Sequence, residues 1–232
     1  MELRRWEELP RFMQTEEVAA YHQVLVRRRA SLFWKRWSDF LLSSLLLFLL
    51  WPLMAAVAVW IRLDSEGPAL FMQKRVTQYG RVFWILKFRT MEAERKEAGS
   101  LVTLQEDRRI TRAGRFLRCF RLDELPQLFN IWKGEMSFVG TRPEVPQYVK
   151  HYTKEMYATL LLPAGLTSEA SIRFKDEAAF LAPFLAAGED ADEAYIGHVL
   201  PVKMAYNLKA VGSYSFWGEL WTMARTVFAV LR

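Results

Sequence analysis

Residues 40–61 read FLLSSLLLFLLWPLMAAVAVWI, a run without a single charged side chain. As a straight α-helix this run would be about 33 Å long, enough to cross the hydrocarbon core of a bilayer. A buried core helix is disfavoured, because the run is apolar on all sides and long for a domain of this size. It begins too far from the N-terminus, after a charged segment, to be a cleaved signal peptide. The run therefore predicts a membrane protein.

A proline and the flanking charges decide how this run meets the membrane. Pro52 lies near its middle, directly after Trp51, and predicts a kink because proline removes a backbone hydrogen bond and clashes with the preceding turn. Lys35 and Arg36 precede the run and Arg62 follows it. A re-entrant hairpin with its kink at Trp51 and Pro52 keeps all these charges on the cytoplasmic side, whereas a single span does not. From the residues alone, hairpin and span both stay open.

The rest of the chain divides around this run. Residues 1–34 hold an amphipathic pattern over 16–30 that ends in three arginines. This pattern is typical of a helix on an anionic membrane surface, although a solvated extension is equally compatible. Residues 35–62 are the predicted membrane segment, which in the re-entrant alternative is a helix-break-helix. Residues 63–232 mix short strand and helix patterns, which predicts an α/β domain, mostly helical with a small β-hairpin around 78–80.

Composition narrows the class of protein further. The chain has 232 residues, of which 52% are hydrophobic, so it can bury a core and is not globally disordered. Its net charge of +6 indicates attraction to an anionic partner: acidic lipid, phosphorylated metabolites or nucleic acid. The single Cys119 excludes an internal disulfide and a cysteine-based zinc site, and it fits a reducing compartment.

Asp123 and Glu124, here called the acid pair, stand at the start of a helix predicted over 122–132. Adjacent carboxylates repel each other and lose hydration beside apolar neighbours, which is costly unless a cation or a reaction uses them. Pro126 is tolerated only in the first turn of that helix, so Asp123 is expected close to the N-cap, where backbone N–H groups create an anion site. Simple helix capping by two acids is the structural alternative.

Arginines on both sides of the acid pair point to phosphate chemistry. Arg118 precedes the pair, and Arg142 follows on a Gly-x-Arg-Pro turn. Guanidinium groups bind phosphate through planar, bidentate contacts. Among them, the carboxylate of Asp123 can attack phosphorus, while Glu124 can hold a divalent cation, for which oxygen ligands favour Mg²⁺ over Zn²⁺. The sequence contains no P-loop and no nucleophile-elbow serine, and a membrane segment beside an acid pair argues against a nucleic-acid partner.

The acid pair belongs to a series of short motifs in a fixed order. These are Lys35-Arg36 with Asp39, the apolar run with Pro52, Gly67-Pro68, Gln73-Lys74-Arg75, Lys87-Phe88-Arg89-Thr90-Met91, Arg109-Ile110-Thr111-Arg112, Gly114-Arg115-Phe116-Leu117-Arg118, Leu122-Asp123-Glu124-Leu125-Pro126-Gln127-Leu128-Phe129-Asn130, Lys133-Gly134-Glu135-Met136-Ser137 and Val139-Gly140-Thr141-Arg142-Pro143. In this order they resemble the bacterial sugar transferases, the small monotopic polyprenyl-phosphate phosphoglycosyl transferases. The resemblance covers about residues 32–232.

The resemblance implies a reaction at the cytoplasmic face of the bacterial inner membrane. Such enzymes move a sugar-1-phosphate from a UDP-sugar onto undecaprenyl phosphate and release UMP. The scheme that the family implies is ping-pong: the aspartate that matches Asp123 takes the phosphosugar covalently, and the polyprenyl phosphate then displaces it. Glu124 matches the magnesium-binding partner, and both members of the acid pair are expected Mg²⁺ ligands. The family likeness also favours the hairpin over the span, with residues 63–232 as the cytoplasmic catalytic domain.

Further site residues follow from the matched motifs. The resemblance implies phosphate contacts from Arg118, Arg142, Lys87, Arg89 and Arg112, and a nucleotide or sugar pocket at Gln127, Thr141 and Pro143. Leu162 stands where the family usually has an arginine, so Arg173 or Lys175 is expected to supply any contact made there. The implied partners are anionic membrane lipid, a second copy of the chain and downstream glycosyltransferases. A non-catalytic membrane scaffold for glycan enzymes, with a merely structural acid pair, is the alternative.

Overall fold

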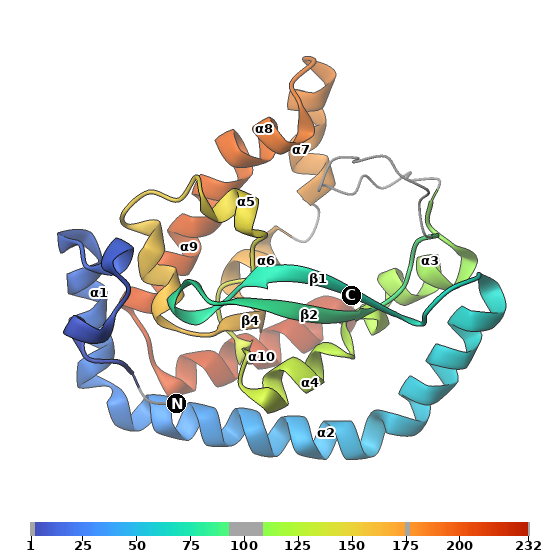
Figure 1. Cartoon of the computed structure of the whole chain (residues 1–232), viewed down its shortest axis with the longest axis horizontal. Helices are drawn as coiled ribbons and strands as arrows, with labels where there is room; N and C mark the ends of the chain where they lie inside the picture. Colours follow the sequence, from blue (N-terminus) through green and yellow to red (C-terminus); the bar gives the residue numbers. More distant parts are fainter. Residues whose placement is uncertain (1–2, 93–108, 175–176, 232) are drawn as a thin grey trace.

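The computed structural model describes residues 3–92, 109–174 and 177–231, and it is mostly helical with two small sheets. A long helix, α2 (Arg29–Asp64), runs along one edge of the molecule, and the rest of the chain lies on one side of it (Figure 1). The predicted class, a helix-rich α/β chain with a small β-hairpin, is confirmed.

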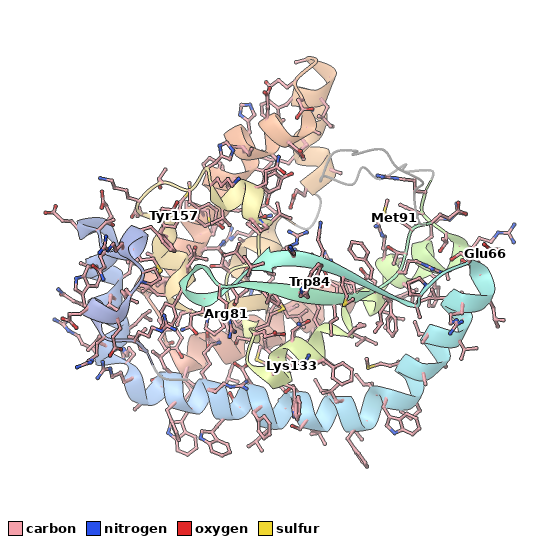
Figure 2. The ribbon with its side chains drawn as sticks, viewed as in Figure 1. Glu66, Arg81, Trp84, Met91, Lys133 and Tyr157 are labelled. Atoms are coloured by element: carbon pink, nitrogen blue, oxygen red, sulfur yellow. The ribbon has the colours of Figure 1, made fainter. Side chains whose placement is uncertain are left out.

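Helix α2 carries the apolar run and contains Pro52 in its interior. Only 11% of its apolar window is buried, which excludes the core helix of a soluble protein. Its outward side chains point away from the body, as Figure 2 shows along the outer edge of the helix. Large exposed side chains on α2 include Trp34, Trp37, Leu41, Leu45, Phe48, Leu49 and Trp51. By length and composition α2 can serve as a membrane anchor.

Both ends of α2 are attached to the same body. Near its start, Lys35 donates to Glu219 at 2.7 Å, and Asp39 accepts a hydrogen bond from a backbone N–H of β3 (Met136–Val139) at 3.3 Å. Near its end, Ile61 is buried in a cluster with Leu117, and Asp64 accepts from the first turn of α3 (Arg112–Cys119) at 3.0 Å. In Figure 1, α2 bends toward α3 in its C-terminal part.

The N-terminal segment differs from the expectation. Helix α1 (Glu16–Arg27) begins after Thr15, whose side chain accepts from a backbone N–H of the first turn. We expected its apolar face on a membrane surface or in solvent. Instead Val18, His22 and Leu25 are buried, and α1 contacts η5 (Met156–Leu161) and α9 (Leu200–Gly212). The apolar side of α1 thus packs against the protein's own core, and the polar side of α1 faces outward.

Two small sheets lie in the middle of the body. The predicted hairpin is confirmed: β1 (Leu70–Val76) pairs antiparallel with β2 (Val82–Phe88). The second sheet pairs β3 in parallel with β4 (Ala164–Thr167) and was not predicted. Its connection was expected as one helix over 148–162, but the structure has α5 (Pro146–Val149) and the separate turn η5.

The C-terminal third is helical. It contains α6 (Glu169–Arg173), α7 (Glu177–Ala186), α8 (Ala191–Ala194), α9 and α10 (Phe216–Leu231). The expected helices over 176–187, 199–211 and 216–231 are confirmed. On α10, Glu219 faces α2 and Thr226 bonds Thr167 of β4, while Trp217 and Trp221 are exposed. The aromatic side of α10 therefore faces away from the core.

Candidate active site

The acid pair lies in η4 (Leu122–Glu124), a single turn between α3 and α4 (Gln127–Lys133). Both carboxylates are buried, with 9% exposure for Asp123 and 8% for Glu124. The N-cap of α4 is Pro126, so the expectation that Asp123 lies close to the N-cap is wrong. The chain forms a separate tight turn before Pro126, and α4 starts only after it. The groups that act on the Asp123 carboxylate are therefore side chains and not the N–H groups of a helix N-terminus.

The turn begins with an unusual backbone. Arg121 has φ 56° and ψ 21°, the left-handed region that side chains other than glycine rarely adopt. This conformation reverses the chain between the end of α3 and η4. It places both acids on a turn whose geometry costs about 1–2 kcal/mol relative to an ordinary backbone. Strain of this kind is concentrated at functional sites.

Three cations converge on one oxygen of Glu124. Its Oε1 lies 2.8 Å from Nη2 of Arg142, 3.5 Å from Nζ of Lys87 and 3.8 Å from Nη1 of Arg121. Burial alone would raise the pKa of Glu124, but Arg142, Lys87 and Arg121 together hold that pKa at about 2. Glu124 is therefore a permanent anion at any physiological pH, and it fixes the positions of the surrounding cations.

Asp123 has the opposite electrostatics. Burial and the neighbouring charge of Glu124 raise the pKa of Asp123 above its ordinary range, and Lys87, Arg118 and Arg121 oppose the rise only in part. A raised pKa means a carboxylate that is poorly stabilised as an anion, and such a group is a better nucleophile than one neutralised by an ion pair. The acid pair is thus divided into one carboxylate that its surroundings stabilise as an anion and one that they do not.

The cations reach the acid pair from distant parts of the sequence. Lys87 comes from β2, and Arg142 from the loop that follows β3. That loop is fixed by the close approach of Gly140 and Gly165, where a Cβ on either glycine would meet the backbone of the other segment. The N–H of Gly165 also donates to the carbonyl of Thr141 at 2.8 Å. The parallel sheet therefore sets the position of Arg142.

Asn130 is a site-supporting residue that sequence reasoning missed. It is 1% exposed, and it joins α4 to the edge of β2. Its Nδ2 donates to the carbonyl of Trp84 at 2.8 Å, and its Oδ1 accepts from the N–H of Leu86 at 3.0 Å. These bonds hold the strand beside Lys87 against the helix that follows the acid pair. The sequence feature that could have identified Asn130 was its position within the motif over residues 122–130.

The remaining predicted cations are not all at the acid pair. Arg118 donates to the Thr90 hydroxyl at 2.9 Å and contributes to the field at Asp123. Arg89 is buried and donates to Ser65 at the end of α2, so in this structure it holds that turn. Arg112 is exposed on the first residue of α3. Among the described contacts, neither Arg89 nor Arg112 reaches the acid pair.

The comparison with known protein families decides the family. The model of the family described as "Bacterial sugar transferase" matches residues 30–232. The chain belongs to this family.

Curated relatives of this sugar transferase carry related names. The chain is 34% identical over 203 residues to the UDP-N-acetylgalactosamine-undecaprenyl-phosphate N-acetylgalactosaminephosphotransferase of Aeromonas hydrophila, covering 86% of this chain and 44% of the relative. It is 44% identical over 121 residues to the UDP-glucose:undecaprenyl-phosphate glucose-1-phosphate transferase of Xanthomonas campestris pv. campestris, covering 52% of this chain and 25% of the relative. A glucose-1-phosphate transferase of Caulobacter vibrioides is 34% identical over 200 residues, covering 85% of this chain and 69% of the relative. The chain thus spans less than half of the first two relatives.

The predicted pocket residues of this sugar transferase lie around Arg142. Pro143 and Arg142 line a cavity of about 240 Å³. Thr141 lies next to Arg142 in the same loop, and Gln127 is 1% exposed at the start of α4. In the part of the chain that the structure describes, the Gln127 amide nitrogen has no hydrogen-bond partner.

The position usually occupied by an arginine is apolar here. Leu162 is buried in the main hydrophobic cluster. Arg173 bonds Glu169 at 2.8 Å and stacks over Tyr206, so it is engaged away from the acid pair. Lys175 lies outside the described residues. Of the two expected substitutes, Arg173 therefore does not take the missing place in this structure.

The acid pair stands apart from any dense cluster of metal-binding side chains among the described residues. Within residues 3–92, 109–174 and 177–231, no group of three or more histidine, cysteine or acidic residues converges on a point. A dedicated cage is therefore not built there. Mg²⁺ is, however, commonly held by one or two carboxylates together with substrate phosphates. Lys87, Arg121 and Arg142 contact Oε1 of Glu124, so the oxygens that could take part in such a shared site are those of Asp123 and the second oxygen of Glu124.

Proposed function

We propose that this sugar transferase moves a sugar-1-phosphate from a UDP-sugar to undecaprenyl phosphate and releases UMP, through a covalent phosphosugar on Asp123. The relatives named above support the two substrates. The unequal acid pair supports the mechanism, because it provides one buried carboxylate that is poorly stabilised as an anion, beside a cluster of cations. This inequality is the single observation that carries the proposal.

The reaction has two displacements at the same phosphorus. In the first, a carboxylate oxygen of Asp123 attacks the phosphorus that bears the sugar, and the bond to the UMP oxygen breaks with its electron pair leaving on UMP. In the second, a phosphate oxygen of undecaprenyl phosphate attacks that phosphorus. The bond to Asp123 then breaks, the carboxylate is restored, and undecaprenyl-diphosphate-sugar is formed.

Each side chain at the site has a separate task. Arg142 and Lys87, held in place by Glu124, offset the charge that develops on the phosphate oxygens during each displacement. Arg118 adds positive charge on the side of Asp123. Asp123 and Glu124 would hold a Mg²⁺, which when bound would supply positive charge to the diphosphate. Burial of both carboxylates keeps water away from an acyl phosphate that water would otherwise hydrolyse.

We place the enzyme on the cytoplasmic face of the bacterial inner membrane, anchored without crossing it. Both ends of α2 bond to one body, whereas a helix that spans a bilayer would carry its ends to opposite sides. The outer side of α2 exposes large apolar side chains, and the tryptophans of α10 suit the interface. The proposed re-entrant course through Pro52 follows from this attachment. The active site then lies where a lipid phosphate meets a soluble nucleotide.

The activity is tested with the protein in detergent or nanodiscs. Release of UMP is measured for UDP-glucose, UDP-galactose and UDP-N-acetylgalactosamine, each with undecaprenyl phosphate. A donor labelled in the sugar is then used without the lipid, to trap protein-bound label. We expect label on the wild-type chain and none on Asp123→Asn. Labelled Asp123→Asn would exclude this nucleophile, and absence of UMP release with every donor would favour the scaffold.

The membrane course is tested by cysteine labelling in cells. In a Cys119→Ser background, single cysteines replace Ser31, Trp51 or Ser65, which lie near the start, the middle and the end of α2. We expect no reaction of Ser31→Cys or Ser65→Cys with an impermeant reagent added from the periplasm. Labelling of only one of these two flanks would establish a single span and overturn the proposed anchoring.

A further inference from the structure

A polar cavity shares Arg142 with the active site and is lined in part by helices that lie across the hairpin from α2. Its volume is about 240 Å³. Charged and hydroxyl groups dominate its lining, namely Arg75, Arg142, Glu144, Glu177, Tyr195 and Lys203. The walls come from β1, the loop after β3, and the helices α5, α7 and α9, and in Figure 1 these helices lie across the hairpin from α2.

Arg142 connects this cavity to the acid pair. Its Nη2 bonds Oε1 of Glu124 at 2.8 Å, and the same side chain forms part of the cavity wall. A diphosphate that contacts Arg142 at the acid pair therefore has one of its substituents at the mouth of the cavity. The cavity is thus adjacent to the phosphorus at which the proposed reaction occurs.

Buried charges line the far wall of the cavity. Nζ of Lys203 lies 3.0 Å from Glu177, 2.9 Å from the Tyr195 hydroxyl and 3.8 Å from Glu144. The Tyr195 hydroxyl in turn donates to Glu144 at 2.7 Å. Burying such a network costs free energy that apolar packing would not. It provides alternating hydrogen-bond donors and acceptors at fixed positions, which is what a ligand rich in hydroxyl groups requires.

We infer that this cavity binds the glycosyl group of the UDP-sugar and selects among sugars, an inference that rests on the proposed function. Uracil would need a free aromatic face. The rings of Tyr148 and Tyr195 stack on each other at 4.7 Å, and Lys203 lies over Tyr195 at 5.1 Å, so these faces are already used. The hydroxyl groups of a sugar can instead form hydrogen bonds with Glu177 and Lys203, which line the cavity.

The order of the proposed reaction supports the same assignment. UMP leaves after the first displacement, and the lipid phosphate enters for the second from the side that UMP vacated. Only the glycosyl group is present in both steps. Its subsite must therefore lie off the path shared by UMP and the lipid, and a cavity lined by α5, α7 and α9, the helices across the hairpin from α2, meets that requirement.

Glu177 is the residue with which to test the inference. Its side chain is 34% exposed at the edge of the cavity, so Glu177→Gln keeps the shape of the cavity and removes the charge that lies 3.0 Å from Nζ of Lys203. The matched control is Glu189→Gln, an acid that pairs with His198 and does not line the cavity. For each protein, kcat/KM for UMP release is measured with UDP-glucose, UDP-galactose and UDP-N-acetylgalactosamine, together with the inhibition constant of UMP.

We expect Glu177→Gln to change the ratio of kcat/KM between two of these donors by about tenfold, the effect of one hydrogen bond to a charged group. The inhibition constant of UMP is expected to stay within about twofold, and Glu189→Gln to match the wild type. A second variant, Ala178→Val, narrows the cavity, and it should disfavour UDP-N-acetylgalactosamine relative to the smaller UDP-glucose.

The outcomes separate this inference from the function on which it rests. A wild-type enzyme that releases no UMP would overturn both. An active enzyme in which both variants leave every sugar ratio unchanged would overturn the glycosyl subsite alone. A parallel loss for all three donors with a weaker UMP inhibition would assign the cavity to the nucleotide instead.

Discussion

The acid pair at η4 and the anchor pair, Lys35 with Glu219, are both buried groups of charge, but they are completed in different ways. In the anchor pair, Nζ of Lys35 donates to Glu219 at 2.7 Å and to the carbonyl of Val139 at 2.8 Å, so one cation meets one anion and one carbonyl. At the acid pair, three cations crowd one oxygen of Glu124, while burial and Glu124 raise the pKa of Asp123.

This difference separates a structural ion pair from a reactive site. The anchor pair joins α2 to α10 and has no charge left to act on a ligand. Around the acid pair the cations outnumber the carboxylates, and the fold does not stabilise the Asp123 carboxylate as an anion. Stability and activity should therefore respond in opposite ways when each region is neutralised.

The largest expected effect is on activity at Asp123. Asp123→Asn removes the attacking carboxylate, so UMP release should fall by about 10³-fold or more. The same variant should unfold at a temperature equal to or above that of the wild type, because a buried carboxylate with a raised pKa is lost. The gain should be present above the raised pKa of Asp123 and shrink as the pH falls through it toward the ordinary pKa, because the wild-type group then becomes protonated in the folded protein as well. Thermal unfolding at several pH values measures it, and a clearly destabilised Asp123→Asn would contradict this account.

Neutralising the anchor pair should have the opposite effect and lower the stability of the fold. Lys35→Met leaves Glu219 buried without its cation, at an expected cost of about 3–5 kcal/mol in the free energy of unfolding. Burial already raises the pKa of Glu219. Without Lys35 this carboxyl should protonate more readily, so the loss should shrink as the pH is lowered. Lys133→Met, an exposed lysine on α4, is the control in the same denaturation experiment, and equal losses in both variants would remove the distinction.

Glu124→Gln should lower the stability of the fold, as Lys35→Met does, and should also impair activity, as Asp123→Asn does. Glu124→Gln leaves three cations without their shared anion, which is expected to cost on the order of 3 kcal/mol at neutral pH. Because the folded pKa of Glu124 is about 2, this contribution is fully present above its ordinary pKa and is lost as the pH falls toward 2. Stability measured across this range should therefore converge on that of the wild type in acid. UMP release should also respond less steeply to Mg²⁺, and an unchanged Mg²⁺ dependence would remove Glu124 from the proposed metal site.

The smallest effect separates backbone strain from charge at Arg121. Glycine adopts φ 56° at little cost, whereas alanine does not. Arg121→Gly and Arg121→Ala lose the same guanidinium near Glu124, so their difference reports the backbone alone. We expect the glycine variant to be more stable by about 1 kcal/mol. Equal stabilities would mean that the turn before the acid pair stores no strain.

Much of this molecule followed from local sequence. The apolar run 40–61 predicted a helix with an apolar surface, because it carries no charged side chain over a length that could cross a hydrocarbon core. The hairpin around Tyr79 and the helices over 112–119 and 200–212 likewise followed from turn residues and periodicity. The acid pair was located by the conflict between adjacent carboxylates and their apolar neighbours. These are short-range properties, and a few neighbouring residues determine them.

Tertiary contacts decided the rest. The pattern in 16–30 that predicts a membrane-surface helix is the same pattern that packs α1 on a protein core, and the contacts with η5 and α9 select between the two. From the sequence, phosphate contacts were expected equally of Lys87, Arg89, Arg112, Arg118 and Arg142. In the structure, the hairpin and the parallel pairing of β3 with β4 bring Lys87 and Arg142 to Glu124. Arg89 instead bonds Ser65. Charge acts through distance and burial, and both are set by segments far apart in the chain.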